Sequence, residues 1–368
     1  MTERSLEHHS SRRHEERRLR RYESLPTRPE GADSRSHSLR GLALGLSATG
    51  LGVGALALRR YGSRAALTGA VLGTIALVYA GAVERRWYAL RHDTLPLLRP
   101  AAARPLRILH ISDLHWIPGQ WHRLDFVRRC LDSGPDLIVS TGDALEHPDA
   151  IDAVVRLHAD LARHAPVIAV LGAHDYWGPT YRSPVRYFFE HGKKAYGERF
   201  DTTRFVGGLR EGGVQVLENR RACVDTVAGP VDVAGLGDPH VWYDRPDRID
   251  WSPPDDQVAL RLGVVHAPYR RALDVFDRHG FDLALSGHTH GGQLRLPWVG
   301  ALVANCDLPV GNARGTSRHG AQLWVHVSAG LGHSRYAPLR FACRPEASIL
   351  DIVPRAADAV VSRSVNGM

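Results

Sequence analysis

Short apolar runs rich in Leu, Ile and Val recur between residues 106 and 353, and stretches with helical spacing separate several of them. The periodicity predicts helices at 123–131, 150–164 and 269–279. The predicted strands are Leu106–Ile111, Leu137–Ser140, Val167–Leu171, Val214–Leu217, Val231–Ala234, Leu260–Val265, Leu283–Ser286, Leu323–Val327 and Ile349–Val353. We expect the fourth and fifth to pair. The alternation predicts an α/β domain over 106–353 with a strand-rich second half and a flexible tail at 354–368.

Two long uncharged runs precede this domain, Gly41–Leu58 and Ala65–Val83, and arginines separate them. Each is close to the length needed to cross a bilayer. Either both runs span as a hairpin, only the second spans, or Arg59-Arg60 opens an export signal. A buried soluble hairpin is a further alternative. We favour the transmembrane hairpin over 41–83, because it places the arginine-rich flanks on one side of the membrane.

The flanking segments have compositions that do not favour packed structure. Residues 1–40 are rich in Arg, His, Glu and Ser and predict a disordered basic tail. Residues 84–105 contain Pro96, Pro100 and Pro105, and we interpret them as a linker.

The net charge of +8 belongs to the amino-terminal segment. Residues 1–104 hold 18 basic and 9 acidic side chains, so the remainder holds 29 and 30, from totals of 47 and 39. A near-neutral body argues against a nucleic-acid groove and hence against a nuclease. A basic tail favours proximity to anionic lipid. The four cysteines are scattered without a C-x-x-C motif, so they form either two disulfides or small core residues, and we favour the second.

Residues capable of binding metal follow five of the predicted strands. The strand at Leu106–Ile111 leads into Asp113 and His115, and glycines accompany most of the others. The full set is Asp113, His115, Asp143, His174, Asp175, His266, His288 and His290. Open α/β sheets build their sites at the carboxyl ends of strands, and glycine permits sharp turns there. A single D-x-H motif has little specificity, but the ordered set of five predicts a metal centre.

This ordered set resembles the calcineurin-like metallophosphoesterase superfamily, on Asp113-x-His115, Gly142-Asp143, Gly172-Ala173-His174-Asp175, His266 and Gly287-His288-Thr289-His290. The following Gly291-Gly292-Gln293 and the stretch from Ser328 to Glu346 are similar to its YkuE/YaeI-type subgroup. The resemblance covers roughly residues 105–353. It implies a two-sheet β-sandwich flanked by helices, with two divalent metal ions.

Residue roles follow from the resemblance, position by position. Asp113, His115 and His290 would hold the first metal, Asp143 would bridge both metals, and His266 and His288 would hold the second. His174 would protonate the leaving oxygen, and Asp175 would orient His174. Mixed nitrogen and oxygen ligands suit Mn, Fe or Zn better than Mg or Ca.

The sequence departs from the family pattern at Ala173, where the family usually has an asparagine that ligates the second metal. Alanine cannot ligate, so the second ion would need a water or substrate oxygen. The sequence thus predicts a phosphodiesterase in the cell membrane, with the catalytic domain on the cytoplasmic side, acting on a small or lipid-linked phosphoester. The alternative is a membrane scaffold with an incomplete second metal site. We expect no nucleic-acid partner.

Overall fold

The computed structural model describes most of the predicted domain and part of the amino-terminal region. The described residues are Gly62, 67–179, 197–252, 257–296, 298–333 and 338–355. The predicted basic tail at 1–40, the first apolar run and nearly all of the carboxy-terminal tail lie outside them.

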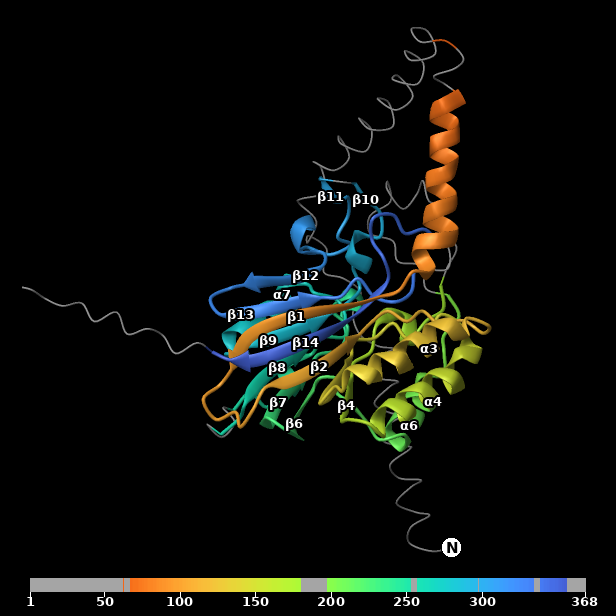
Figure 1. Ribbon diagram of the computed structural model, residues 1–368. Coiled ribbons are helices and arrows are strands. Elements are labelled where there is room, and N and C mark those ends of the chain that lie inside the picture. The colour runs from red at the N-terminus through yellow and green to blue at the C-terminus, as the bar shows by residue number, and fades with distance from the viewer. Residues whose placement is uncertain are drawn as a thin grey trace, which may run out of the picture.

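Two six-stranded sheets form the centre of the domain (Figure 1). The first sheet has the spatial order β1 (Ala89–Leu98), β14 (Glu346–Pro354), β2 (Leu106–Ile111), β3 (Leu137–Ser140), β4 (Val167–Ala169) and β5 (Val214–Val216). The second has the order β12 (Gly315–His319), β13 (Leu323–Val327), β9 (Leu283–Ser286), β8 (Leu260–Val264), β7 (Gly229–Gly235) and β6 (Arg220–Thr226). Strands β2 to β5 are mutually parallel, as are β7, β8, β9 and β13.

Alternating side chains along the strands divide the core into layers. Ile108 and Val139 face an inner cluster together with Leu262 and Leu285 of the second sheet. Leu109, one residue along β2, joins a different cluster on the outer face. Because successive strand side chains point to opposite faces, runs that are apolar throughout fill both layers at once.

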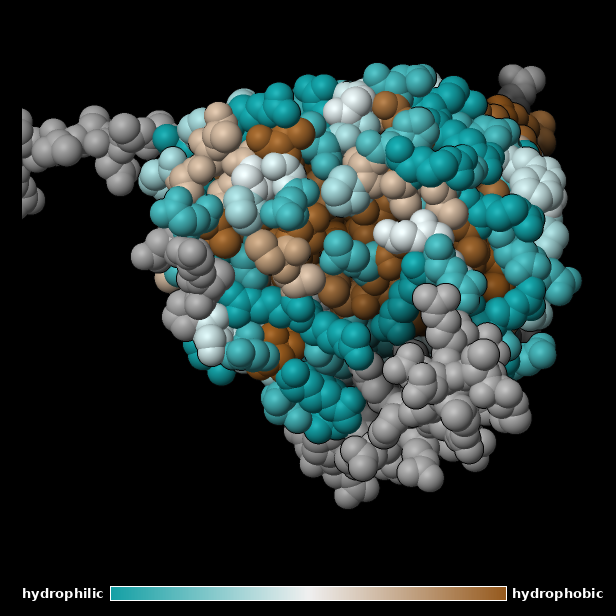
Figure 2. Space-filling model, turned by 90° about the horizontal axis from the view of Figure 1, so that it is seen from below, coloured by the Kyte–Doolittle hydropathy of each residue, from teal (hydrophilic) through white to brown (hydrophobic). Residues whose placement is uncertain are grey.

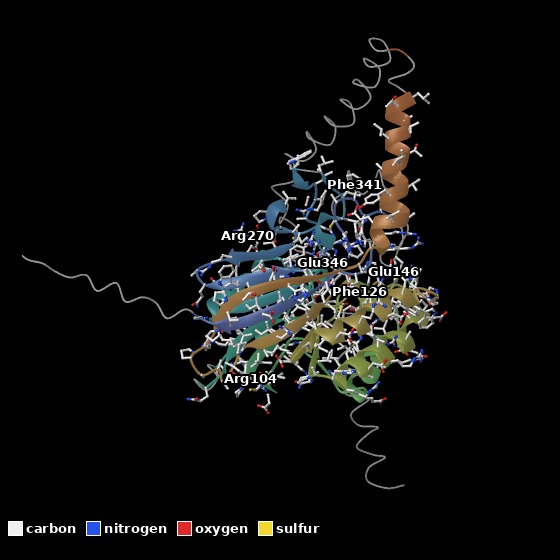
Figure 3. All side chains as sticks on the ribbon, viewed as in Figure 1. Arg104, Phe126, Glu146, Arg270, Phe341 and Glu346 are labelled. Carbon is white, nitrogen blue, oxygen red and sulfur yellow. The ribbon has the colours of Figure 1, made fainter. Side chains whose placement is uncertain are left out.

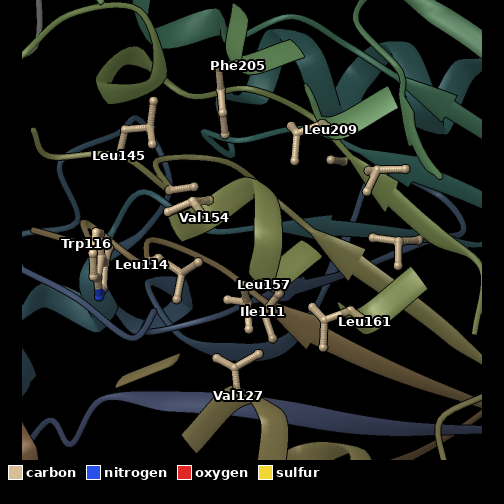
Figure 4. Packing of buried hydrophobic residues seen from close by; sticks show 14 of the residues in the cluster. Ile111, Leu114, Trp116, Val127, Leu145, Val154, Leu157, Leu161, Phe205 and Leu209 are labelled. Carbon is tan, nitrogen blue, oxygen red and sulfur yellow. The ribbon is translucent and has the colours of Figure 1, made fainter. Parts of the chain in front are cut away.

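Helices cover the outer face of each sheet. On the first sheet these are α3 (Trp121–Arg129), α4 (Ile151–Ala162) and α6 (Thr202–Glu211). Figure 4 shows their buried side chains, including Val127, Val154 and Phe205, in one cluster with Ile111. On the second sheet α7 (Arg270–Arg278) buries Leu273 and Phe276. The predicted two-sheet α/β architecture is therefore confirmed.

The linker prediction for 84–105 is wrong, because Ala89–Leu98 forms strand β1. This strand pairs in parallel with β14 along its whole length and buries Leu95, Leu97 and Leu98. Pro96 suggested a linker, but an edge strand tolerates proline since one of its sides has no partner strand to receive an N–H.

The predicted pairing of the fourth and fifth runs is also wrong. Strand β5 lies at the edge of the first sheet beside β4, whereas β7 lies in the second sheet between β6 and β8. Strands β6 and β12 and helix α6 were not predicted. The strand β6 has few buried residues, so it lacks the apolar pattern that marks the others.

One helix of the described chain, Leu67–Arg86, is long and apolar enough to cross a membrane. Its apolar side chains are mostly exposed, and it ends directly before β1 (Figure 1). The four cysteines are all free, but only Cys130 and Cys343 are the core residues that we predicted, because Cys223 is exposed and Cys306 is half-buried.

Candidate metal centre

The carboxyl ends of four strands, two from each sheet, meet at one place. Strands β2 and β3 lead to Asp113, His115 and Asp143, while β8 and β9 of the second sheet lead to His266, His288 and His290. Most of these side chains are buried. The six residues that the sequence predicts as metal ligands therefore lie together.

The backbone at these positions is unusual. Five of the six ligand candidates have positive φ angles between 40° and 68°, namely Asp113, His115, Asp143, His288 and His290. Few non-glycine residues adopt this left-handed region, and such residues concentrate at functional sites. The turn after each strand end aims the side chain at the common centre.

Asp113, His115 and His290 form a first group whose ligand atoms all lie within 4.8 Å of one another. The Nε2 atoms of His115 and His290 are each 3.9 Å from Asp113 Oδ1. The backbone N–H of His288 donates to both Asp113 oxygens at 3.1 Å, and this fixes the carboxylate.

Asp143, His266 and His288 form a second group within the same distance limit. Asp143 Oδ2 is 3.1 Å from His266 Nε2 and 3.6 Å from His115 Nε2. One carboxylate therefore lies between the two groups, which is the position that a bridging ligand requires.

Hydrogen bonds on the far side of each imidazole orient the ligand nitrogens. The Nδ1–H of His266 donates to the Thr141 carbonyl at 2.8 Å, and that of His115 donates to Glu146 at 2.6 Å. The Nε2 atoms then face the centre, where both are buried and make no hydrogen bond. Metal-binding histidines are held in this way, so the residues fit divalent cations.

The charges at the centre are strongly coupled. Burial lowers the pKa of His266, but Asp143 outweighs it and raises the pKa well above the usual value. The Asp143 carboxylate thus favours a positive charge at the place that His266 Nε2 faces, which is where a cation would bind. Burial raises the pKa of Asp113. The nearby Asp143 carboxylate raises it further, because two carboxylates share a small buried space.

His174 lies at the same centre, with about a quarter of its side chain exposed. Its Nδ1 is 2.8 Å from Glu146 Oε2. Burial lowers the pKa of His174, but Glu146 and then Asp143 raise it to about 9. His174 is therefore protonated at neutral pH.

The predicted orienting role of Asp175 is wrong, because its carboxylate binds backbone rather than His174. It accepts N–H groups from Gly172, Asp143, Ala144 and Leu145 at 2.8 to 3.1 Å. Asp175 consequently fixes the loop that carries Asp143.

Glu146 is the residue that holds His174, and the sequence analysis missed it. The same carboxylate contacts Nδ1 of both His115 and His174. The available signal was its place three residues after Asp143, in the same strand-end loop.

Glycines leave the room that these side chains occupy. A Cβ on Gly172 would collide with the Asp143 carboxylate and the His266 ring, and one on Gly287 would collide with Ser112 and Asp113. Ala173 lies beside this centre, in the short turn Ala173–Asp175, and offers no ligand oxygen. The second group accordingly holds three side-chain ligands.

Comparisons with known proteins agree with this geometry. The family model described as calcineurin-like phosphoesterase matches residues 106–292. Phosphodiesterase YaeI of Escherichia coli (strain K12) is 30% identical over 277 residues, which are 73% of this chain and 90% of that protein. The metallophosphoesterase YkuE of Bacillus subtilis (strain 168) is 27% identical, over 71% of this chain and 84% of its own length.

A third relative has a lipid-related name. UDP-2,3-diacylglucosamine pyrophosphatase LpxG of Chlamydia trachomatis serovar D is 28% identical over 52% of this chain and 66% of its own length. The family match covers half of the chain, and YaeI matches along most of both chains. The chain therefore belongs to the calcineurin-like phosphoesterase family, beside YaeI and YkuE, and is a phosphoester hydrolase.

Proposed function

We propose that this protein is a membrane-tethered phosphodiesterase with a dinuclear metal centre. The observation that carries the proposal is the position of Asp143, whose carboxylate lies between the Asp113–His115–His290 group and the His266–His288 pair. Bound at these two groups, divalent cations of the Mn, Fe or Zn type would activate a water and neutralise charge on the phosphoryl oxygens.

The chain's own residues supply the remaining chemistry. His174 carries a proton at neutral pH and lies beside both metal groups, so it is placed to protonate the leaving oxygen. A general acid of this kind contributes roughly 10²–10⁴ in rate. Glu146 holds the His174 ring in place and favours its charged form.

The substrate we propose is a small or lipid-linked phosphoester. The helix Leu67–Arg86 supports membrane tethering, because its length suits a bilayer and few of its side chains are buried by the domain. The name of the relative LpxG supports a lipid-linked substrate. The cytoplasmic side of the domain is proposed together with the hairpin over 41–83, because a hairpin places the basic tail and the Arg85-Arg86 pair on the same face of the membrane.

The test uses the full chain, loaded with Mn²⁺, and an artificial aryl phosphodiester. We expect hydrolysis by the wild type and a loss of at least about 10²-fold for Asp143→Asn and His174→Ala, since each removes a directly acting group. Metal analysis of the loaded protein should find two ions per chain in the wild type and fewer in Asp143→Asn.

The rival function is a membrane scaffold that binds one ion and does not turn over, and Ala173 is the observation that favours it. Ala173→Asn would add the missing oxygen, and Ala173→Leu is the control of similar size without it. Two ions and turnover in the wild type would contradict the scaffold. Our proposal would be contradicted by a wild type that binds one ion and does not turn over, if Ala173→Asn, but not Ala173→Leu, gives two ions and turnover.

A further inference from the structure

An exposed apolar hairpin projects from the domain near the metal centre. It consists of β10 (Arg295–Leu296) and β11 (Gly300–Ala301). The Trp298 side chain at its tip is wholly exposed, and Val299 is 71% exposed. Large apolar side chains this exposed mark an interaction surface when they cluster.

Along the sequence, the hairpin lies between His290 and Asn305, which are both at the metal centre. It begins shortly after His290, and the Arg295 guanidinium donates to the Gly291 carbonyl at 2.9 Å. It is followed by Asn305, whose carbonyl accepts a hydrogen bond from His288 Nε2 at 3.1 Å. The base of the hairpin therefore lies next to the metal centre.

Phe341 joins the hairpin to the candidate membrane span. The Arg295 N–H donates to the Phe341 carbonyl at 2.9 Å, and the Phe341 ring packs edge-on against Tyr79 of the helix at 6.3 Å. The next contact, from the Arg340 N–H to the Ala80 carbonyl, fixes the same loop to the helix. Figures 1 and 3 show the hairpin and the helix rising from the same end of the domain, with Phe341 labelled.

Many of the exposed large apolar side chains of the described residues belong to the helix, or lie close in sequence to the hairpin. Outside the helix, the exposed ones are Trp87, Trp121, Leu294, Leu296, Trp298, Val299, Leu302 and Val310. Figure 2 looks at the opposite end, where hydrophilic residues surround a band of hydrophobic ones. None of the large apolar residues of the hairpin or the helix needs a partner from that end, because both rise from the other one.

Aromatic and basic residues border the apolar surface, as they do at membrane interfaces. Trp87 directly follows Arg85 and Arg86, and the Arg344 guanidinium stacks over the Trp87 ring at 4.1 Å. Tryptophan favours the headgroup level, and arginine is attracted to anionic lipid.

We propose that the β10–β11 hairpin inserts Trp298 and Val299 into the same leaflet that Leu67–Arg86 enters. The occupant of this surface is then a lipid bilayer, and two membrane contacts hold the metal centre at headgroup level. This inference rests on the proposed membrane tethering, and it deepens the substrate class to phosphoesters presented within the leaflet.

Fluorescence quenching in vesicles tests the insertion. The full chain is reconstituted into phosphatidylcholine and phosphatidylglycerol vesicles, with or without brominated acyl chains that quench tryptophan at bilayer depth. We expect Trp298→Phe to remove a strongly quenched component that the wild type shows. The matched control is Trp251→Phe, because Trp251 packs against Phe281 at the amino end of β9, away from the metal centre. This control should leave the quenched component unchanged.

Three outcomes would overturn the inference, and they separate it from the tethering. If the full chain floats with vesicles but Trp298→Phe loses no quenched component, the tether stands and the hairpin lies in water. If the fluorescence of Trp298 is the same with and without brominated lipid, and Trp298 cross-links to a second copy of the chain, the surface is a protein interface. If the full chain does not float with vesicles at all, the proposed tethering fails as well.

Discussion

At the scale of single residues, two loop carboxylates hold the centre in different ways. Asp175 accepts backbone N–H groups, whereas Glu146 contacts two imidazoles. Neither role could be predicted from the sequence, because the contacts of both carboxylates depend on how two loops pack. The positions of Asp143 and His266 could be predicted, because each follows an apolar run that ends at the same edge of its sheet.

The charge of Glu146 sets the titration of His174, and this can be measured directly. We expect Glu146→Gln to lower the pKa of His174 from about 9, because it removes the largest contribution that raises it. His174 in the wild type therefore loses its proton only as the pH rises through about 9. In the variant it does so at lower pH. Histidine NMR of the chelated protein measures both.

The same pair contributes to stability with a defined sign. Because the pKa of His174 is raised on folding, the stabilisation is fully present below the ordinary pKa of 6.5 and disappears as the pH rises through about 9.

The exposed Glu198 provides the control for the titration experiment, because Glu198→Gln should leave the His174 titration unchanged. An unaltered titration in Glu146→Gln would contradict the assigned role.

At the scale of elements, apolar strands were predicted well, and elements with a weaker apolar pattern were missed. Strands β2, β3 and β9 are buried on both faces, so their sequences are mostly apolar. Strand β1 alternates imperfectly and contains Pro96, so its partner β14 rather than its own pattern makes it a strand. Such elements depend on contacts that only the folded chain provides.

Removing β1 should weaken the domain strongly. We expect a chain that begins at residue 105 to unfold at a lower temperature than one that begins at residue 84. The shorter chain loses three buried leucines, at about 1.5–3 kcal/mol each, and exposes the edge of β14. It also loses Glu84, whose carboxylate accepts the backbone N–H groups of Ala342 and Cys343. Thermal unfolding followed by circular dichroism compares the two, and equal midpoints would refute this.

At the scale of the whole molecule, each metal group takes ligands from both sheets. Asp113 and His115 follow β2 in the first sheet, while His290 follows β9 in the second. The second group likewise combines Asp143 with His266 and His288. The sequence could suggest two sheets through the resemblance, but not which strands belong to each, as the separation of β5 from β7 shows.

Bound cations should consequently stabilise the packing of one sheet against the other. A free ion concentration of about 100 times the dissociation constant adds about 2.7 kcal/mol to the free energy of unfolding. We expect a chelator to lower the melting temperature and Mn²⁺ to restore it, measured by calorimetry. Asp143→Asn should respond less, and a wild type that is indifferent to chelation would count against the centre.

The left-handed backbone at five ligand positions has a consequence for how the centre is loaded. Because the surrounding fold imposes these rare conformers, we expect the ligand side chains to keep the same arrangement with and without bound ions. Metal binding should then require little change in the backbone. The left-handed backbone also limits which substitutions can retain metal binding, because a replacement at Asp113 or His288 must tolerate the left-handed turn and supply a donor atom.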